Sequence, residues 1–223
     1  MAAPPSSNSA RDDEGRALRE ARQQRQRDEA RRAILDATEA VLVEDGPDGL
    51  SMRNVASRCG YAAPTLYHYF GDKTGLIDAV LDERFSRLFA RLQDVAKGDD
   101  PAAYLAELAR AFVRFGEDNP SHYHLLTVRS PGDRPPPPNA ERARDLMEAP
   151  ILQLEEAGRL RESNCEVVLQ TLWALCHGLI SLTTSRPDYE WSEGLVDHAI
   201  DSLLNGILQQ PGTRRARPRG ETK

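Results

Sequence analysis

The chain has 223 residues, of which 39% are hydrophobic and 29% charged, and its formal net charge is −6. This composition is typical of a globular protein able to bury a core, and the negative charge excludes a polyanion-binding surface that covers the whole chain. We expect a cytoplasmic protein without a membrane partner. No apolar run approaches the roughly 20 residues of a spanning helix, and residues 1–15 lack the basic and apolar regions of a signal peptide.

Residues 1–27 are predicted to form a disordered or partly helical arm. Its first part is rich in Ala, Pro, Ser and Asn, which favours disorder, whereas residues 16–32 carry seven arginines and three acidic residues. Because arginines can neutralise phosphates and this run leads directly into the helical motif that follows, we predict that it contacts DNA. A second basic run, within residues 210–223, is interpreted as a disordered, solubilising tail.

A helix-turn-helix is predicted at about residues 51–70. The apolar residues of the stretch 52–59 recur at the i, i+3, i+4, i+7 spacing of one helical face, and Ser51 can cap that helix at its start. Gly60 suits the turn, where a positive φ costs little only for glycine. Pro64 falls in the first turn of a second helix, where its missing N–H costs nothing.

The rest of the chain is also predicted to be helical. An amphipathic helix that ends at EDGPDG precedes the motif, and a longer helix, capped by Asp72 and ended by KGDDP, follows it. Further helices are expected at about 101–115, 140–157, 165–184 and 191–208, with a short helix or turn over 121–128 and a proline-rich loop over 130–139. No segment alternates as a β-strand does, so the predicted fold class is all-α.

Short sequence elements around the motif fall at the spacing of a known family. They are Leu50-Ser51, Val55-Ala56, Gly60-Tyr61, the run PTLYHYF from Pro64 to Phe70, and Lys73. With these elements, residues 30–90 resemble the DNA-binding domain of TetR-type transcriptional repressors. The resemblance implies an N-terminal three-helix DNA-binding domain, assigned to 28–95, and a C-terminal helical domain for effector binding and dimerisation, assigned to 96–209.

Two details refine the resemblance. Ala62 stands where the family commonly has Ser, which removes a capping hydroxyl worth about 1 kcal/mol. Trp173, His177 and Gly178 look like the Trp–His–Gly signature of one TetR C-terminal subtype.

The resemblance also implies which side chains contact DNA. Tyr67 and His68 are expected to bind phosphates, Lys73 to add a charge at the start of the next helix, and Thr65 to reach base edges. The full predicted set is Arg27, Arg31, Ser51, Arg53, Ala62, Ala63, Pro64, Thr65, Tyr67, His68 and Lys73. Since this surface has few hydrogen-bonding groups, we expect DNA shape and the arginine arm to carry much of the selectivity.

The C-terminal domain is predicted to hold an unknown small-molecule effector and to form a homodimer. The predicted effector pocket consists of Phe112, Phe115, Tyr123, His124, Trp173 and His177. The predicted dimer interface consists of Leu172, Leu175, Leu179, Leu195, Leu203 and Ile207, on two helices that would make a four-helix contact with the partner. Packing within the chain's own core is the alternative interpretation of both sets.

No enzyme activity, metal or cofactor is predicted. The sequence has no GxSxG, GxGxxG, P-loop or HExxH motif, and neither its histidines nor its cysteines have metal-ligand spacing. Cys59, Cys165 and Cys176 are interpreted as reduced thiols, with a redox-sensing pair as the alternative. The predicted function is a ligand-released repressor that binds a pseudo-palindromic operator as a homodimer. The alternatives are an activator, a regulator without a small-molecule effector, or a protein-interaction adaptor on the same fold without autonomous sequence-specific DNA binding.

Overall fold

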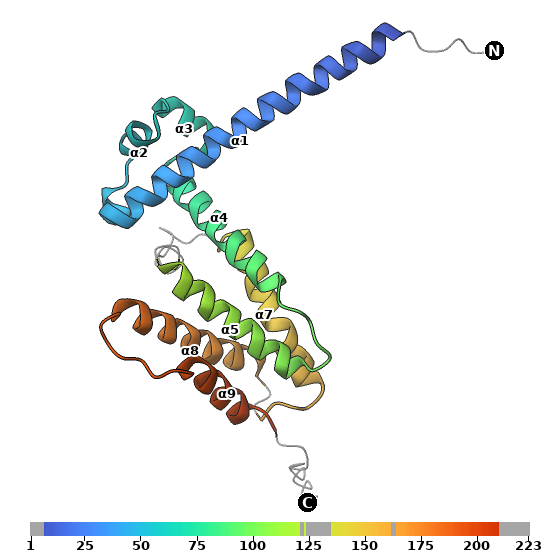
Figure 1. The fold of residues 1–223 in the computed structure, drawn as a ribbon, viewed down its shortest axis with the longest axis vertical. Helices are drawn as coiled ribbons and strands as arrows, with labels where there is room; N and C mark the ends of the chain where they lie inside the picture. Colours follow the sequence, from blue (N-terminus) through green and yellow to red (C-terminus); the bar gives the residue numbers. More distant parts are fainter. Residues whose placement is uncertain (1–6, 121–122, 124–134, 162–163, 210–223) are drawn as a thin grey trace, which may run out of the picture. The chain divides into compact units, whose positions relative to one another are not determined.

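The computed structural model describes residues 7–120, 123, 135–161 and 164–209 (Figure 1). These described residues form helices and no strand, apart from one isolated bridge between Leu160 and Leu208, which confirms the all-α prediction. The helices are α1 (Ser7–Gly49), α2 (Met52–Cys59), α3 (Ala63–Phe70), α4 (Lys73–Gln93), α5 (Pro101–Asp118), α7 (Pro138–Glu156), α8 (Cys165–Ser185) and α9 (Leu195–Ile207). Most of the helix and loop predicted between 121 and 134, with His124, and the 210–223 tail lie outside the described residues.

The chain forms two compact units that meet within one helix. The first is built on the residues up to Leu81 and the second on the residues from Asp82 onward. This division falls inside α4, whereas the sequence places a boundary after residue 95, at the end of that helix. The first half of α4 is therefore described with the N-terminal unit and the second half with the C-terminal unit.

The N-terminal unit has a small core formed by α1–α3 and the start of α4. Ile34 and Val41 of α1, Val55 of α2 and Leu66 of α3 are fully buried. α1 begins earlier and ends later than its amphipathic stretch, and Gly46, with φ 70° and ψ 179°, interrupts it at the predicted EDGPDG stop. The predicted helix end is thus present as a kink, after which helical residues continue to Gly49.

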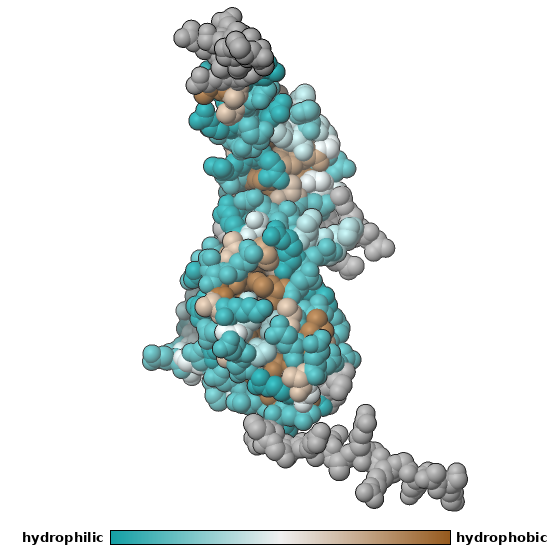
Figure 2. Space-filling model, turned by 90° about the vertical axis from the view of Figure 1, so that its right-hand side faces the viewer, coloured by the Kyte–Doolittle hydropathy of each residue, from teal (hydrophilic) through white to brown (hydrophobic). Residues whose placement is uncertain are grey.

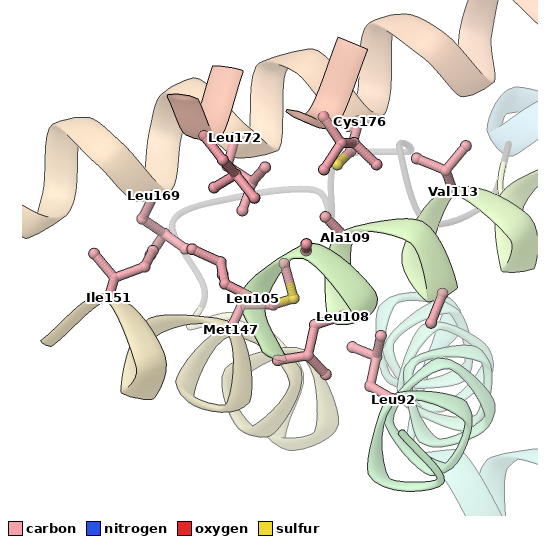
Figure 3. Close-up of a cluster of buried hydrophobic side chains, with 14 of the residues drawn as sticks. Leu92, Leu105, Leu108, Ala109, Val113, Met147, Ile151, Leu169, Leu172 and Cys176 are labelled. Carbon is pink, nitrogen blue, oxygen red and sulfur yellow. The ribbon is translucent and has the colours of Figure 1, made fainter. Parts of the chain in front are cut away.

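The C-terminal unit is organised around α5, which contacts α7, α8 and α9. Figure 3 shows side chains of α7 and α8, among them Met147 and Leu172, directed toward Leu105 and Leu108 of α5. Leu105, Leu108 and Leu172 have no exposed surface, and full burial of such a side chain stabilises the fold by about 1.5–3 kcal/mol. This core fixes α5 as the central helix of the unit.

Two closer contacts fix the other helices on α5. Gly116 lets α8 approach, because a Cβ atom at this position would lie 2.6 Å from Ile180 Cδ1. On another side, the Arg110 guanidinium donates hydrogen bonds to Asp197 (2.6 Å) and Asp201 (2.5 Å) of α9. Both contacts tie residues far apart in sequence to one helix.

The end of α9 is fastened to the connection between α7 and α8 by main-chain bonds. The Arg161 N–H donates to the Ile207 carbonyl (2.9 Å), and the Gln209 N–H donates to the Arg159 carbonyl (2.8 Å). The Gln209 side-chain amide adds a bond to the Leu160 carbonyl (2.8 Å). We call this pairing of 159–161 with 207–209 the C-terminal clasp.

One sequence prediction about the last helices is wrong, and one helix is more apolar than expected. α9 begins at Leu195 rather than at Trp191, because Gly194 adopts a left-handed conformation (φ 77°) that cannot continue a helix. α8 has 21 residues and a mean hydropathy of 1.4 in its most apolar window, so by length and composition alone it could span a membrane. A core helix of a soluble protein meets the same test, and the buried side of α8 includes Leu172 and Ile180.

Candidate nucleic-acid interface and effector cavity

Local capping defines the helix-turn-helix within the N-terminal unit. The Ser51 hydroxyl accepts a hydrogen bond from the Asn54 N–H (3.1 Å), which caps α2 as predicted. Gly60 follows with φ 75°, in the left-handed region that favours glycine. Arg58 pairs with Glu44 of α1 at 2.6 Å, an exposed contact that the sequence did not reveal. The turn between α2 and α3 is therefore set by local chemistry.

α3 presents the predicted DNA-contacting side chains to solvent around one buried anchor. Leu66 is fully buried, whereas Tyr67 is 52% exposed and His68 is also exposed. Ala62 and Pro64 are exposed at the start of the helix, where Ala62 makes no side-chain cap, as its missing hydroxyl predicts. Ala63 and Thr65 are half-buried. The outward side of α3 is thus the side that sequence analysis assigned to DNA.

Basic side chains lie on the elements beside α3. Lys73 is the first residue of α4 and is half-buried, and Arg53 on α2 is exposed. Arg27 and Arg31 on α1 are exposed, and the Arg31 guanidinium lies 5.8 Å from the centre of the Phe70 ring at the end of α3. This contact places the arginine-rich part of α1 next to the recognition segment within the same unit.

A cavity of about 540 Å³ lies within the C-terminal unit. It is bounded by the second half of α4 and by α5, α7 and α8, and most of its lining is aliphatic or aromatic, including Leu88, Phe112, Met147 and Trp173. Among its described lining residues, those with charged or amide groups are Glu141, Arg144, Glu166 and Gln170. The volume is within the range of about 300–1,000 Å³ typical of small-molecule sites.

The predicted pocket residues divide between this cavity and a second one. Phe112 and Trp173 line the first cavity, whereas Tyr123 and His177 line a second cavity of about 500 Å³. Phe115 lines neither and is packed in the core. The described residues of the predicted pocket therefore do not line one continuous cavity.

His177 lies between the two cavities in a cluster of aromatic rings. Its ring centre is 4.9 Å from that of Trp173 and 5.4 Å from those of Phe112 and Tyr123. The Tyr123 hydroxyl lies 2.6 Å from His177 Nδ1. Burial lowers the pKa of His177 and raises the pKa of Tyr123 to about 12, because each charged form loses hydration. The pair is therefore held in its neutral form near pH 7.

Comparison with protein families identifies both halves of the chain. Residues 34–80 match the model of bacterial regulatory proteins of the tetR family, and residues 105–205 match the tetracyclin repressor-like C-terminal domain. Together these matches cover more than half of the chain. The chain belongs to the TetR family.

Individual relatives agree with this assignment. The TetR-family chain is 37% identical over 100 residues to the HTH-type transcriptional repressor KstR of Mycobacterium tuberculosis, an alignment that covers 44% of the chain and 46% of KstR. It thus spans less than half of this curated relative. A TetR family transcription regulator from Marinobacter aquaeolei has the same fold, with a TM-score of 0.70, 18% identity and coverage of 83% and 100% of the two chains. So does the regulator FadR from Bacillus subtilis, solved with stearoyl-CoA, with a TM-score of 0.66, 14% identity and coverage of 78% and 98%.

The predicted dimer residues of this TetR-family chain occupy two different environments. Leu172 is 0% exposed and Leu179 is also buried, so both pack in the chain's own core, the alternative that the sequence left open. Leu175, Leu195, Leu203 and Ile207 are half-buried against that core. Periodicity located the apolar helices but could not tell which side of each faces inward.

Other residues that form these surfaces were not predicted from the sequence. Leu88 of α4 and Met147 of α7 line the first cavity, although the sequence indicates only that they are apolar residues at helical spacing. The exposed apolar surface of α8 lies one step around the helix from the predicted leucines, where Val167 and Leu182 are 48% and 51% exposed. No pairwise spacing rule separates these residues from ordinary core positions.

Proposed function

We propose that this TetR-family chain is a DNA-binding transcriptional regulator that acts in the cytoplasm as a homodimeric repressor and is released from its operator by a small molecule. The observation that carries the proposal is α3, a recognition helix anchored by the buried Leu66, whose Tyr67 and His68 face solvent beside Arg31 of α1. Exposed aromatic and basic groups on such a helix suit phosphate and base contacts. KstR, a transcriptional repressor by name, supports the direction of regulation.

Selection of bound fragments from genomic DNA by the purified protein tests DNA recognition. Wild type is expected to enrich a short pseudo-palindrome, and Tyr67→Phe and Lys73→Ala are expected to weaken its binding because each loses one phosphate contact. Tyr189→Phe and Lys97→Ala remove the same groups from exposed positions outside the helix-turn-helix and should bind as wild type does. Absence of any enriched sequence would refute autonomous DNA recognition and favour the adaptor.

Dimerisation is supported by an exposed stripe on α8. Val167, Thr171, Ala174, Gly178 and Leu182 follow one helical face outside the core, with small residues between two exposed aliphatic ones. On the face drawn in Figure 2, apolar surface occurs as islands in a mostly hydrophilic surface. An exposed apolar stripe of this kind indicates a protein interface. Two copies of α8 that meet along the stripe would cover it by two-fold symmetry.

Sedimentation of paired variants tests this interface. Leu182→Glu places a charge in the stripe and is expected to yield monomers, whereas Leu152→Glu changes an equally exposed leucine on α7 and should remain dimeric. A Leu182→Glu protein that sediments like wild type would refute the interface while leaving the fold and DNA recognition intact.

Release by an effector requires that the ligand prefer one conformation. Recognition helices of a dimer fit successive major grooves when their centres are about 34–36 Å apart. A ligand that binds better to a state with another separation lowers DNA affinity by its differential affinity for the two states. The cavity in the C-terminal unit supports the presence of such a ligand. Separately, the residues Trp173, His177 and Gly178 on α8 support assignment of that domain to the Trp–His–Gly subtype. Identical helix separations with and without inducer would refute this mechanism.

A further inference from the structure

The first cavity of the C-terminal unit combines an apolar body with an acidic mouth. Leu88, Phe112, Met147 and Leu172 come from four different helices and leave the interior to carbon and sulfur atoms. A polar ligand group buried there would lose its hydration without a hydrogen-bond partner from these side chains. The ligand must therefore be largely apolar, and any charged group it carries must lie at the mouth.

The charges of the mouth belong to α7 and the start of α8. The Arg144 guanidinium donates to Glu166 (2.5 Å) and to Glu148 (2.9 Å), so a single cation is shared by two carboxylates. The Gln170 amide donates to the same Glu166 side chain (2.8 Å). Glu141 also lines the cavity, whereas Glu148 does not. Among the lining residues, two carboxylates, those of Glu141 and Glu166, thus stand against the single guanidinium of Arg144.

A neighbouring cation does not change this balance at the cavity. The Arg142 guanidinium lies 4.1 Å from the centre of the Phe89 ring and donates to the Asn139 side chain (2.9 Å). Neither Arg142 nor Phe89 lines the cavity. The negative field is also felt by Cys165, whose thiol pKa is raised by burial and further by Glu148 and other surrounding carboxylates, with Arg144 acting in the opposite direction.

Aromatic surface completes the mouth. Trp173 lines the cavity and is 60% exposed, and Phe112 lies deeper on α5. The face of an indole ring attracts a cation through its quadrupole, most strongly where water is partly excluded. The carboxylates and the indole face thus both favour a positive charge on the ligand.

We infer that this cavity takes a lipophilic monocation, an apolar body that carries one ammonium-type group, in preference to a fatty-acid-like anion. The inference deepens the effector site of the proposed function and rests on it. The apolar body lies among the side chains of α4, α5 and α7, and the ammonium group lies at the mouth between Trp173 and Glu166.

A matched series of probes tests the inference. Decyltrimethylammonium, decanol and decanoate share one chain length and carry charges of +1, 0 and −1. Trp191→Phe leaves Trp173 as the single reporter of fluorescence, and titration calorimetry gives an independent affinity. Because exposed charge pairs contribute only modestly to affinity, the cation is expected to bind roughly five- to tenfold more tightly than decanoate. The affinity for decanol should lie between the other two affinities, and added salt should reduce the differences among the three.

Charge-removing variants test whether the named carboxylates cause this order. Glu166→Gln removes one carboxylate and releases Arg144. The variant should therefore bind the cation more weakly and decanoate more tightly than wild type does. Glu156→Gln removes the same charge from the exposed end of α7, outside the lining, and should leave the order unchanged. Equal effects of the two variants would attribute the preference to overall charge and overturn the inference.

The remaining outcomes also decide the matter. Decanoate as the tightest probe, equal affinities for all three, or no binding of any probe would overturn the inference. DNA selection without added ligand is run in the same buffer and separates this failure from failure of the proposed function. A protein that binds its operator but prefers decanoate remains a regulator with a different ligand class, whereas one that enriches no DNA sequence fails as a regulator whatever it binds in the cavity.

Discussion

The arginines of α1 are expected to contribute to DNA affinity from one side of the helix only. At about 100° per residue, Arg16, Arg19, Arg27 and Arg31 fall within a sector of about 120°. Further along α1, the same sector contains the buried residues Ile34 and Val41, which face the rest of the N-terminal unit. These four arginines therefore lie on the side of α1 that packs against the rest of the N-terminal unit, and Arg31 reaches Phe70 of α3.

The perturbation is the triple variant Arg16→Gln, Arg19→Gln and Arg27→Gln, which leaves Arg31 on Phe70. Glutamine has nearly the helix propensity of arginine, so helix content should be unchanged. The matched control replaces Arg22, Arg25 and Arg32, which lie on the opposite side of α1, and removes the same net charge.

The salt dependence of operator binding measures the difference. Each neutralised phosphate contributes about −0.9 to the slope of log K against log salt, so loss of three contacts should flatten the slope by up to about 2.7. The affinity advantage of wild type over the variant should then shrink by about 40-fold between 50 and 200 mM salt. The control should keep nearly the wild-type slope. Equal slopes for the two triple variants would refute a directed contact, since diffuse attraction does not depend on the side of the helix.

Two further predictions concern the C-terminal unit. Gly116→Ala should lower the free energy of unfolding in urea by about 1 kcal/mol or more, because the clash of its Cβ with Ile180 exceeds the helix-propensity gain of about 1 kcal/mol. Gly206→Ala, with no atom within 4 Å of its Cβ, should leave stability equal or slightly higher, and the reverse order would contradict the close approach. Because burial lowers the pKa of His177, protonation favours the unfolded chain, and stability should fall as pH drops below about 6.5 toward the lowered pKa. His177→Asn can still accept a hydrogen bond from Tyr123 but does not titrate. The loss of unfolding free energy between pH 7.5 and pH 5.5 should therefore be smaller in this variant than in wild type. An equal loss in both proteins would assign the pH dependence to other groups.

The features predicted best from the sequence are the helix ends and turns that depend on residues close together in the chain. Ser51, Gly60 and Pro64 determine α2, the turn and α3 through capping and backbone preferences that act within a few residues, and each lies as expected. The predicted start of α9 was wrong because Gly194 ends the preceding irregular segment, whereas the apolar pattern had placed the start at Trp191.

The cavity and the exposed stripe of α8 depend instead on how helices pack. Leu172 and Leu182 are equally apolar and lie on one helix, yet the first is wholly buried and the second is half exposed. Their difference comes from the rotation of α8 against α5, which Gly116 allows through its contact with Ile180. A pattern of hydrophobic residues along one helix contains no information about that rotation.

The C-terminal clasp has a practical consequence for the design of shorter chains. Its main-chain bonds join 159–161 to 207–209 whatever side chains are present, so the chain is anchored to the C-terminal unit as far as Gln209. A chain that stops there should keep the melting temperature of the full protein. One that stops at Leu204 would leave the Arg159 and Leu160 carbonyls without their Gln209 donors and should melt earlier. A fluorophore or affinity tag fused directly after Gln209 would therefore start from an anchored point, which suits distance measurements between the two subunits of the proposed dimer.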